Sequence, residues 1–188
     1  YGFTFTLEGQ LDHADGAGEN VISGVPFQVQ VADKDGTTAS ADFSVDIVDD
    51  VPQAVDEATI TLGEGGESVG SANGGANLLA NDETGADGAT VTEIAYTDEA
   101  GAARTASVDP TNGVTVDTQH GSLTVNADGT WSYTSDASVA GAGVSDAFTY
   151  TITDADGDTS SATQGITLTD GGPKIGFPDG DPGTPDAE

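Results

Sequence analysis

The sequence predicts an all-β protein built from antiparallel β-sandwich modules. Three observations lead to this fold class. Apolar and polar residues alternate in many short runs, which is the period of a half-buried strand. Gly, Asn and Asp turns separate the runs, and no segment longer than a turn or two carries the period of a helix. One hairpin-like segment also occurs twice along the chain.

The repeated segment divides the chain into modules. Residues 27–52 align without gaps to residues 148–173, which lie 121 positions later. The residues that recur at this offset are Phe27, Asp33, Asp35, Gly36, Thr38, Ser40, Ala41, Asp49 and Pro52. We therefore expect the C-terminal part of one module over 1–51, a complete sandwich over 52–172, and a Pro- and Gly-rich linker or tail over 173–188.

Within the complete module the alternating runs predict strands, in order, at 58–62, 89–96, 113–117, 121–126, 130–134, 148–153 and 165–169. Short strands at this density are typical of two packed antiparallel sheets. Asp128-Gly129 predicts a tight hairpin between two of the strands. Trp131 and Tyr133 then share one face, and we expect both in the core.

The first unit is incomplete. Its runs predict three strands, at 1–9, 27–33 and 41–50, and three strands rarely form a stable core. Their apolar residues need a cover; they are Phe3, Phe5, Leu7, Phe27, Val29, Val31, Phe43, Val45 and Ile47. We expect the cover to come from upstream sequence, since the chain opens on Tyr rather than Met and reads as a fragment of a longer protein. A strand added by another molecule is the alternative.

Charge and composition exclude several classes of function. The 188 residues include 33 acidic and 3 basic side chains, a net charge of -30, which repels nucleic acid and anionic membranes. There is no cysteine, so disulfides, thiol catalysis and thiolate zinc sites are excluded. No apolar run is long enough to span a membrane. A folded chain of this acidity favours bound cations that neutralise part of the charge.

Catalysis has little support. Residues 66–70, GESVG, match the pattern of a nucleophile elbow at Ser68. That elbow joins a strand to a helix, whereas this stretch is glycine-rich on both sides and predicts a flexible loop. No motif places His13 or His120 beside it, so we do not expect an enzyme.

The turn after the strand at 148–153 carries Asp154, Asp156 and Asp158 around Gly157. Carboxylates at this spacing repel one another unless a cation lies between them, and a flexible Asp-rich turn suits calcium better than magnesium. The early glycine and the absence of a closing Glu exclude an EF-hand. The residues alone leave two interpretations open, a calcium site and a solvated acidic turn.

Three motifs in order resemble the VCBS and cadherin-like repeats of giant type I-secreted bacterial adhesins, the RTX adhesins. They are NLLANDETGADGATVTEI (77–94), HGSLTVNADGTWSYTSD (120–136) and DAFTYTITDADGDTSSAT (146–163). Residues 1–20 resemble related long repeats of the same proteins. The resemblance implies tandem immunoglobulin-like β-sandwiches with calcium at loops and junctions.

The resemblance also implies the calcium ligands. In the second hairpin they are Asp154, Asp156 and Asp158. The first hairpin matches with Asp33 and Asp35 but has Thr37 in the third position, so we expect a weaker site there. The acidic loop contributes Asn81, Asp82 and Asp87. Beside the inter-module proline, where calcium could brace the joint or the charges could simply be solvated, lie Asp49, Asp50, Asp56 and Glu57.

By the same resemblance we expect a calcium-bound extender in a secreted, cell-surface adhesin that acts in adhesion and biofilm formation. Its partners would be neighbouring repeat modules, with glycan or host ligands bound by other domains, and without nucleic acid or membrane insertion. The chain has no G-G-x-G-x-D array and no recognisable secretion signal, so type I secretion is implied by the resemblance alone. Alternatives are a module that binds a glycan or protein through His13, Asp15, Tyr96 and Arg104, or a strand-donating fibre subunit.

Overall fold

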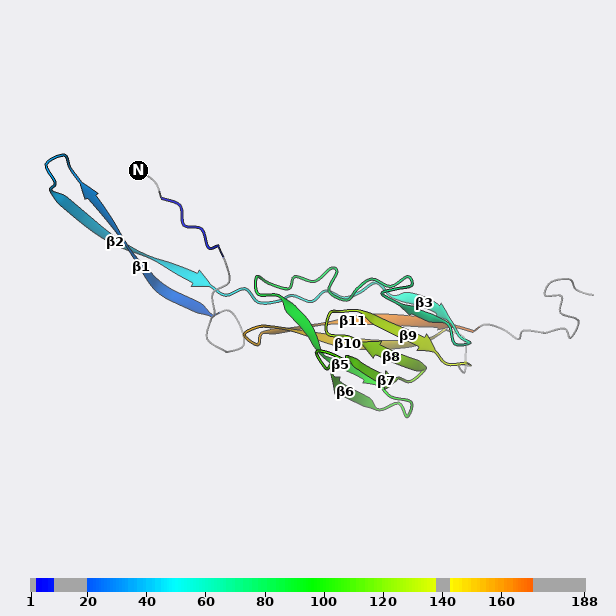
Figure 1. Cartoon of the computed structure of the whole chain (residues 1–188). Coiled ribbons are helices and arrows are strands. Elements are labelled where there is room, and N and C mark those ends of the chain that lie inside the picture. Colours follow the sequence, from blue (N-terminus) through cyan, green and yellow to red (C-terminus); the bar gives the residue numbers. More distant parts are fainter. Residues whose placement is uncertain (1–2, 9–19, 138–142, 171–188) are drawn as a thin grey trace, which may run out of the picture.

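The computed structural model describes residues 3–8, 20–137 and 143–170. Two sheets pack face to face as a sandwich, and a separate two-stranded sheet extends from one end of it (Figure 1). The fold is all-β, as predicted. Across the described ranges there is no helix that could cross a membrane.

The larger sheet has the order β3-β11-β10-β5-β6, and β3 pairs parallel to β11 while the other pairs are antiparallel. The strands are β3 (Ile60–Gly63), β11 (Thr159–Thr169), β10 (Val144–Asp154), β5 (Ala89–Thr97) and β6 (Ala103–Ser107). The sequence did not predict β6. It is an edge strand whose residues are mostly exposed, so it lacks the apolar alternation on which the prediction depends.

The smaller sheet has the order β4-β9-β8-β7, with β4 (Ser68–Gly70), β9 (Trp131–Ser135), β8 (Gly121–Val125) and β7 (Val114–Asp117). The predicted Asp128-Gly129 hairpin joins β8 to β9. The flexible loop predicted around Ser68 is wrong, because Ser68 to Gly70 form the edge strand β4. Glycine permits this pairing, since a Cβ on Gly70 would lie 2.3 Å from the Trp131 carbonyl oxygen.

The alternating residues of both sheets meet in one core. Trp131 and Tyr133 are buried there, as predicted, and the Trp131 ring meets the Phe148 ring edge-on at 5.6 Å. Other buried members are Leu62, Val69, Leu78, Val91, Ile94, Leu123, Val125, Tyr150, Ile152, Ile166 and Leu168. Each buried side chain of this size contributes about 1.5–3 kcal/mol, so the sandwich is the stable unit of the chain.

The two-stranded sheet is a hairpin of β1 (Val21–Ala32) and β2 (Thr38–Val48), hereafter the N-terminal hairpin. The prediction of a strand over residues 1–9 is wrong where it can be compared, because residues 3–8 pair with no neighbouring strand. Phe3 and Phe5 nevertheless contact the rings of Phe43 and Phe27. The predicted tail, residues 173–188, lies outside the described residues.

Candidate metal centre

The turn between β10 and β11 is held by Asp154. Its Oδ1 atom accepts hydrogen bonds from the backbone N–H groups of Gly157, at 3.0 Å, and Asp158, at 2.6 Å. The N–H of Asp154 in turn donates to the Asp158 carbonyl oxygen at 3.1 Å. Gly157 takes a φ of 105°, which only glycine adopts without strain. One carboxylate oxygen of Asp154 is thus committed to the turn.

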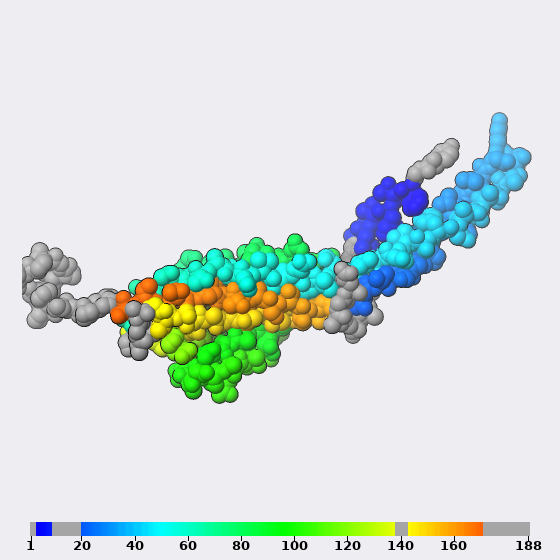
Figure 2. Space-filling model, turned by 180° about the vertical axis from the view of Figure 1, so that it is seen from behind, coloured from blue at the N-terminus to red at the C-terminus, as the bar shows by residue number. Residues whose placement is uncertain are grey.

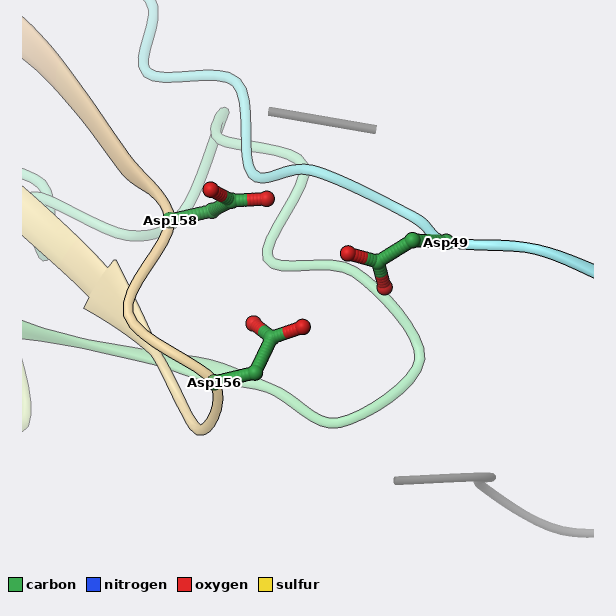
Figure 3. Close-up of side chains that lie close together, drawn as sticks. All are labelled: Asp49, Asp156 and Asp158. Carbon is green, nitrogen blue, oxygen red and sulfur yellow. The ribbon is translucent and has the colours of Figure 1, made fainter. Parts of the chain in front are cut away.

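Two distant segments bring further carboxylates to this turn. Asp49, just after β2, lies with Asp156 and Asp158 so that one carboxylate oxygen of each falls within 4.8 Å of the others, and Figure 3 shows all three converging. Asp87, from the loop before β5, forms a second such group with Asp154 and Asp156. Asp156 belongs to both groups, so the five residues form one aspartate cluster.

The aspartate cluster fits a hard cation. Asp158 and Asp154 are only 2% and 8% exposed. The Oδ2 atom of Asp154 and the Oδ1 atom of Asp156 are buried and accept no hydrogen bond from the described residues. The pKa of Asp156 is raised, first because it shares a hydrogen bond with the Asp154 carboxyl and then by burial. Buried carboxylate oxygens without a donor are the ligands that Ca²⁺ binds.

A second acidic group, Asp82 and Glu57, lies beside the Tyr150 hydroxyl. The Tyr150 hydroxyl lies 3.2 Å from both carboxylate oxygens of Asp82, and the Oε1 atom of Glu57 is buried without a described hydrogen-bond partner. Burial raises the pKa of Asp82, and burial followed by the charge of Asp82 raises that of Glu57. These two carboxylates do not join the aspartate cluster in a metal-binding group among the described residues.

The remaining predicted ligands of the module connect the segment between β2 and β3 to the sandwich. Asp56 Oδ1 accepts the Thr163 N–H at 2.8 Å, and the Asn81 side-chain amide donates to the Val55 carbonyl oxygen at 3.1 Å. Asp50 lies against Gly85, in the loop that carries Asp87. Asp56 and Asn81 therefore contact backbone groups.

In the N-terminal hairpin, Asp33 and Asp35 bond to their own turn. Asp33 Oδ1 accepts the N–H groups of Asp35 and Thr37, and Asp35 Oδ1 accepts the Thr37 hydroxyl at 2.8 Å. The pKa of Asp35 is lowered, chiefly by hydrogen bonding with Asp33 and then with Thr37. Both residues are exposed, and within the described ranges no third carboxylate completes a metal-binding group with them.

The sequence did not single out Asp146, which is buried in the core. Its Oδ2 atom accepts the Thr118 hydroxyl at 2.6 Å, the Tyr133 hydroxyl at 3.1 Å and the His120 N–H at 3.3 Å. Asp146, Phe148 and Tyr150 occupy alternate positions of β10 and therefore face the core together. A charged residue at a core-facing position was the feature of the sequence that could have identified it. It ties both sheets together at one end of the sandwich.

The residues considered for catalysis or direct binding are dispersed. Ser68 Oγ lies 2.9 Å from the Thr134 hydroxyl on the neighbouring strand β9. Arg104 forms an ion pair with Asp98 at 2.7 Å. His13 and Asp15 lie outside the described residues.

Alkaline pH should destabilise the sandwich through two buried tyrosines. Burial, then the charge of Asp146, raises the pKa of Tyr133 above 10.0; burial, then the charges of Asp82 and Glu57, does the same for Tyr150. Folding therefore favours the protonated phenols, so the stability that they contribute is present below pH 10.0 and is lost as the pH rises above it. Denaturant unfolding between about pH 9 and about pH 11 measures this loss. A Tyr133→Phe, Tyr150→Phe double variant with an unchanged pH slope would contradict it.

Comparison with known proteins agrees with this architecture. The profile of the bacterial cadherin-like domain family matches residues 49–170, which include the whole sandwich and every member of the aspartate cluster. No curated protein matches the chain closely. Domains of this family are typically structural and extracellular. Because the match covers more than half of the sequence, the chain belongs to the bacterial cadherin-like domain family.

Proposed function

We propose that this chain is a calcium-rigidified extender segment of a secreted, cell-surface bacterial adhesin of the RTX type. Its sandwich would hold ligand-binding regions away from the cell, with neighbouring repeat modules as its partners. Calcium would supply positive charge between carboxylates that otherwise repel. The residues that would hold it are Asp49, Asp87, Asp154, Asp156 and Asp158.

The observation that carries this proposal is the pair of buried carboxylate oxygens, Asp154 Oδ2 and Asp156 Oδ1, that accept no hydrogen bond from the described residues. A solvated acidic turn would leave such oxygens in water. Burying a charged oxygen without a partner is costly, and a bound cation removes that cost.

The origin of the ligands supports a mechanical role. Asp49 belongs to the connection between the N-terminal hairpin and the sandwich, whereas Asp87 and the three turn residues belong to the sandwich itself. A cation bound by Asp49, Asp156 and Asp158 would therefore fix the connection to the sandwich, which is what an extender requires.

Calcium should raise the stability of the sandwich. For sites with dissociation constants on the order of 10⁻⁴ to 10⁻³ M, about 5 mM Ca²⁺ adds about 1–2 kcal/mol per site. Thermal unfolding in chelator and in calcium, followed by Trp131 fluorescence and by calorimetry, measures the shift. Equal melting temperatures in the two buffers would refute calcium binding.

The two hairpins provide a matched pair of variants. Asp156→Ala should abolish most of the calcium-dependent shift, whereas Asp35→Ala, at the equivalent position of the N-terminal hairpin, should leave most of it. Stability in chelator serves as the control for effects unrelated to calcium. Equal losses in the two variants would contradict the assignment to the aspartate cluster.

A further inference from the structure

The N-terminal hairpin is a structural copy of the β10–β11 hairpin. Phe27 pairs with Phe43 as Phe148 pairs with Gln164, and the two registers remain identical at the offset of 121 residues from Val25 to Ala32. The turns agree too. Asp33 N–H donates to the Thr37 carbonyl oxygen, as Asp154 N–H does to that of Asp158.

The two copies differ in what covers them. In the sandwich, Tyr150 and Ile152 are fully buried. Their equivalents in the N-terminal hairpin, Val29 and Val31, are 48% and 61% exposed. Figure 2 shows the N-terminal hairpin as a narrow arm beyond the end of the sandwich. The described core cluster includes no residue of this arm.

The β10–β11 hairpin has a neighbouring strand on each side, and the described N-terminal hairpin has none. β10 pairs antiparallel with β5 along the edge that faces away from β11, and β11 pairs parallel with β3 along its other edge. In the described residues, β1 and β2 pair only with each other. Unpaired edges beside an exposed apolar face are templates for further strands.

Residues 3–8 contact the N-terminal hairpin at the position where a strand of the smaller sheet contacts β10. Phe5 meets Phe27 edge-on, with ring centroids 5.5 Å apart and an interplanar angle of 67°. In the sandwich, Trp131 of β9 meets Phe148, the equivalent of Phe27, at 5.6 Å and 61°. The segment that leads into β1 thus reproduces the contact of the strand that leads into β10.

We infer that the N-terminal hairpin supplies the last two strands of a second cadherin-like module, and that residues 3–8 lie where its preceding strand, the equivalent of β9, would form. The open face of this unit takes a polypeptide equivalent to residues 53–129, which carry β3 to β8. That polypeptide enters from the N-terminal side, because β3 to β8 precede β9 in the complete module and residues 3–8 hold the β9 position. This inference does not depend on calcium.

The test supplies the missing strands to the full chain. A second copy of residues 53–129 is fused ahead of Tyr1 through a flexible Gly/Ser linker of about ten residues. Amide hydrogen exchange of β1 is then compared with that of β10 in the same molecule. The matched control carries Val91→Asp and Ile94→Asp in the added copy only, because both residues are buried in the sandwich.

The fusion should slow exchange in β1 by at least about 100-fold, while the control leaves β1 as in the parent chain. Unchanged β1 exchange in the fusion would overturn the inference, and so would equal slowing in fusion and control. Protection of β1 in the parent chain that rises with protein concentration would also overturn it, since a second copy would then be the cover.

Discussion

Replacing Phe148 with Ala should lower the free energy of unfolding of the sandwich by about 3–5 kcal/mol. The Phe148 ring is buried in the core and packs edge-on against Trp131, so its removal leaves a cavity between the two sheets. Denaturant unfolding followed by far-ultraviolet circular dichroism measures the loss. The slope of the transition shows whether the variant remains cooperative.

The N-terminal hairpin supplies the control. Phe27→Ala removes the same ring at the equivalent position, where the side chain is not part of the sandwich core. We expect it to change the main transition by less than about 0.5 kcal/mol. A loss of similar size in both variants would show that the hairpin and the sandwich unfold as one unit.

Asp146→Ala should cost about 2–4 kcal/mol, the second largest effect that we expect. The substitution leaves the hydroxyls of Thr118 and Tyr133 and the His120 N–H without their common acceptor inside the fold. It also opens the junction between the two sheets. Chemical denaturation with and without calcium measures the loss.

Asp117→Ala, at an exposed position of β7, is the matched control and should be nearly neutral. Because Asp146 is not a member of the aspartate cluster, the calcium-dependent stabilisation should survive in both variants. A neutral Asp146→Ala would mean that the three donors find other acceptors or water.

Within the sandwich, the strands that the sequence predicted are those with one buried face. Phe148, Tyr150 and Ile152 alternate with threonines, and that pattern follows directly from a strand between core and solvent. The two strands that it missed are edges. β4 has only three residues, of which Val69 and Gly70 are buried, whereas β6 is exposed along most of its length. β4 is too short to show a period, and β6 has no buried face that would produce one.

All five members of the aspartate cluster were candidates from the sequence, but in three separate sites. Asp154, Asp156 and Asp158 were placed in the hairpin, Asp87 in an acidic loop and Asp49 at a module joint. Their convergence depends on how β5 and β10 pair and on where the connection after β2 crosses the sandwich. Those are long-range contacts that local spacing cannot encode. Asp33 and Asp35 had nearly the same local pattern, but no other carboxylate of the described ranges joins them.

The parallel pairing of β3 with β11 has a mechanical consequence. The chain enters the sandwich beside the β10–β11 turn, and β11 leaves it at the opposite end (Figure 1). Tension between these two points pulls β3 toward one end and β11 toward the other, along the direction of the strands. The hydrogen bonds between them are then loaded in shear, so they must yield together rather than one after another. Resistance to stretching is set by this short pair and by the rate of its rupture, and it is separate from the equilibrium stability of the core.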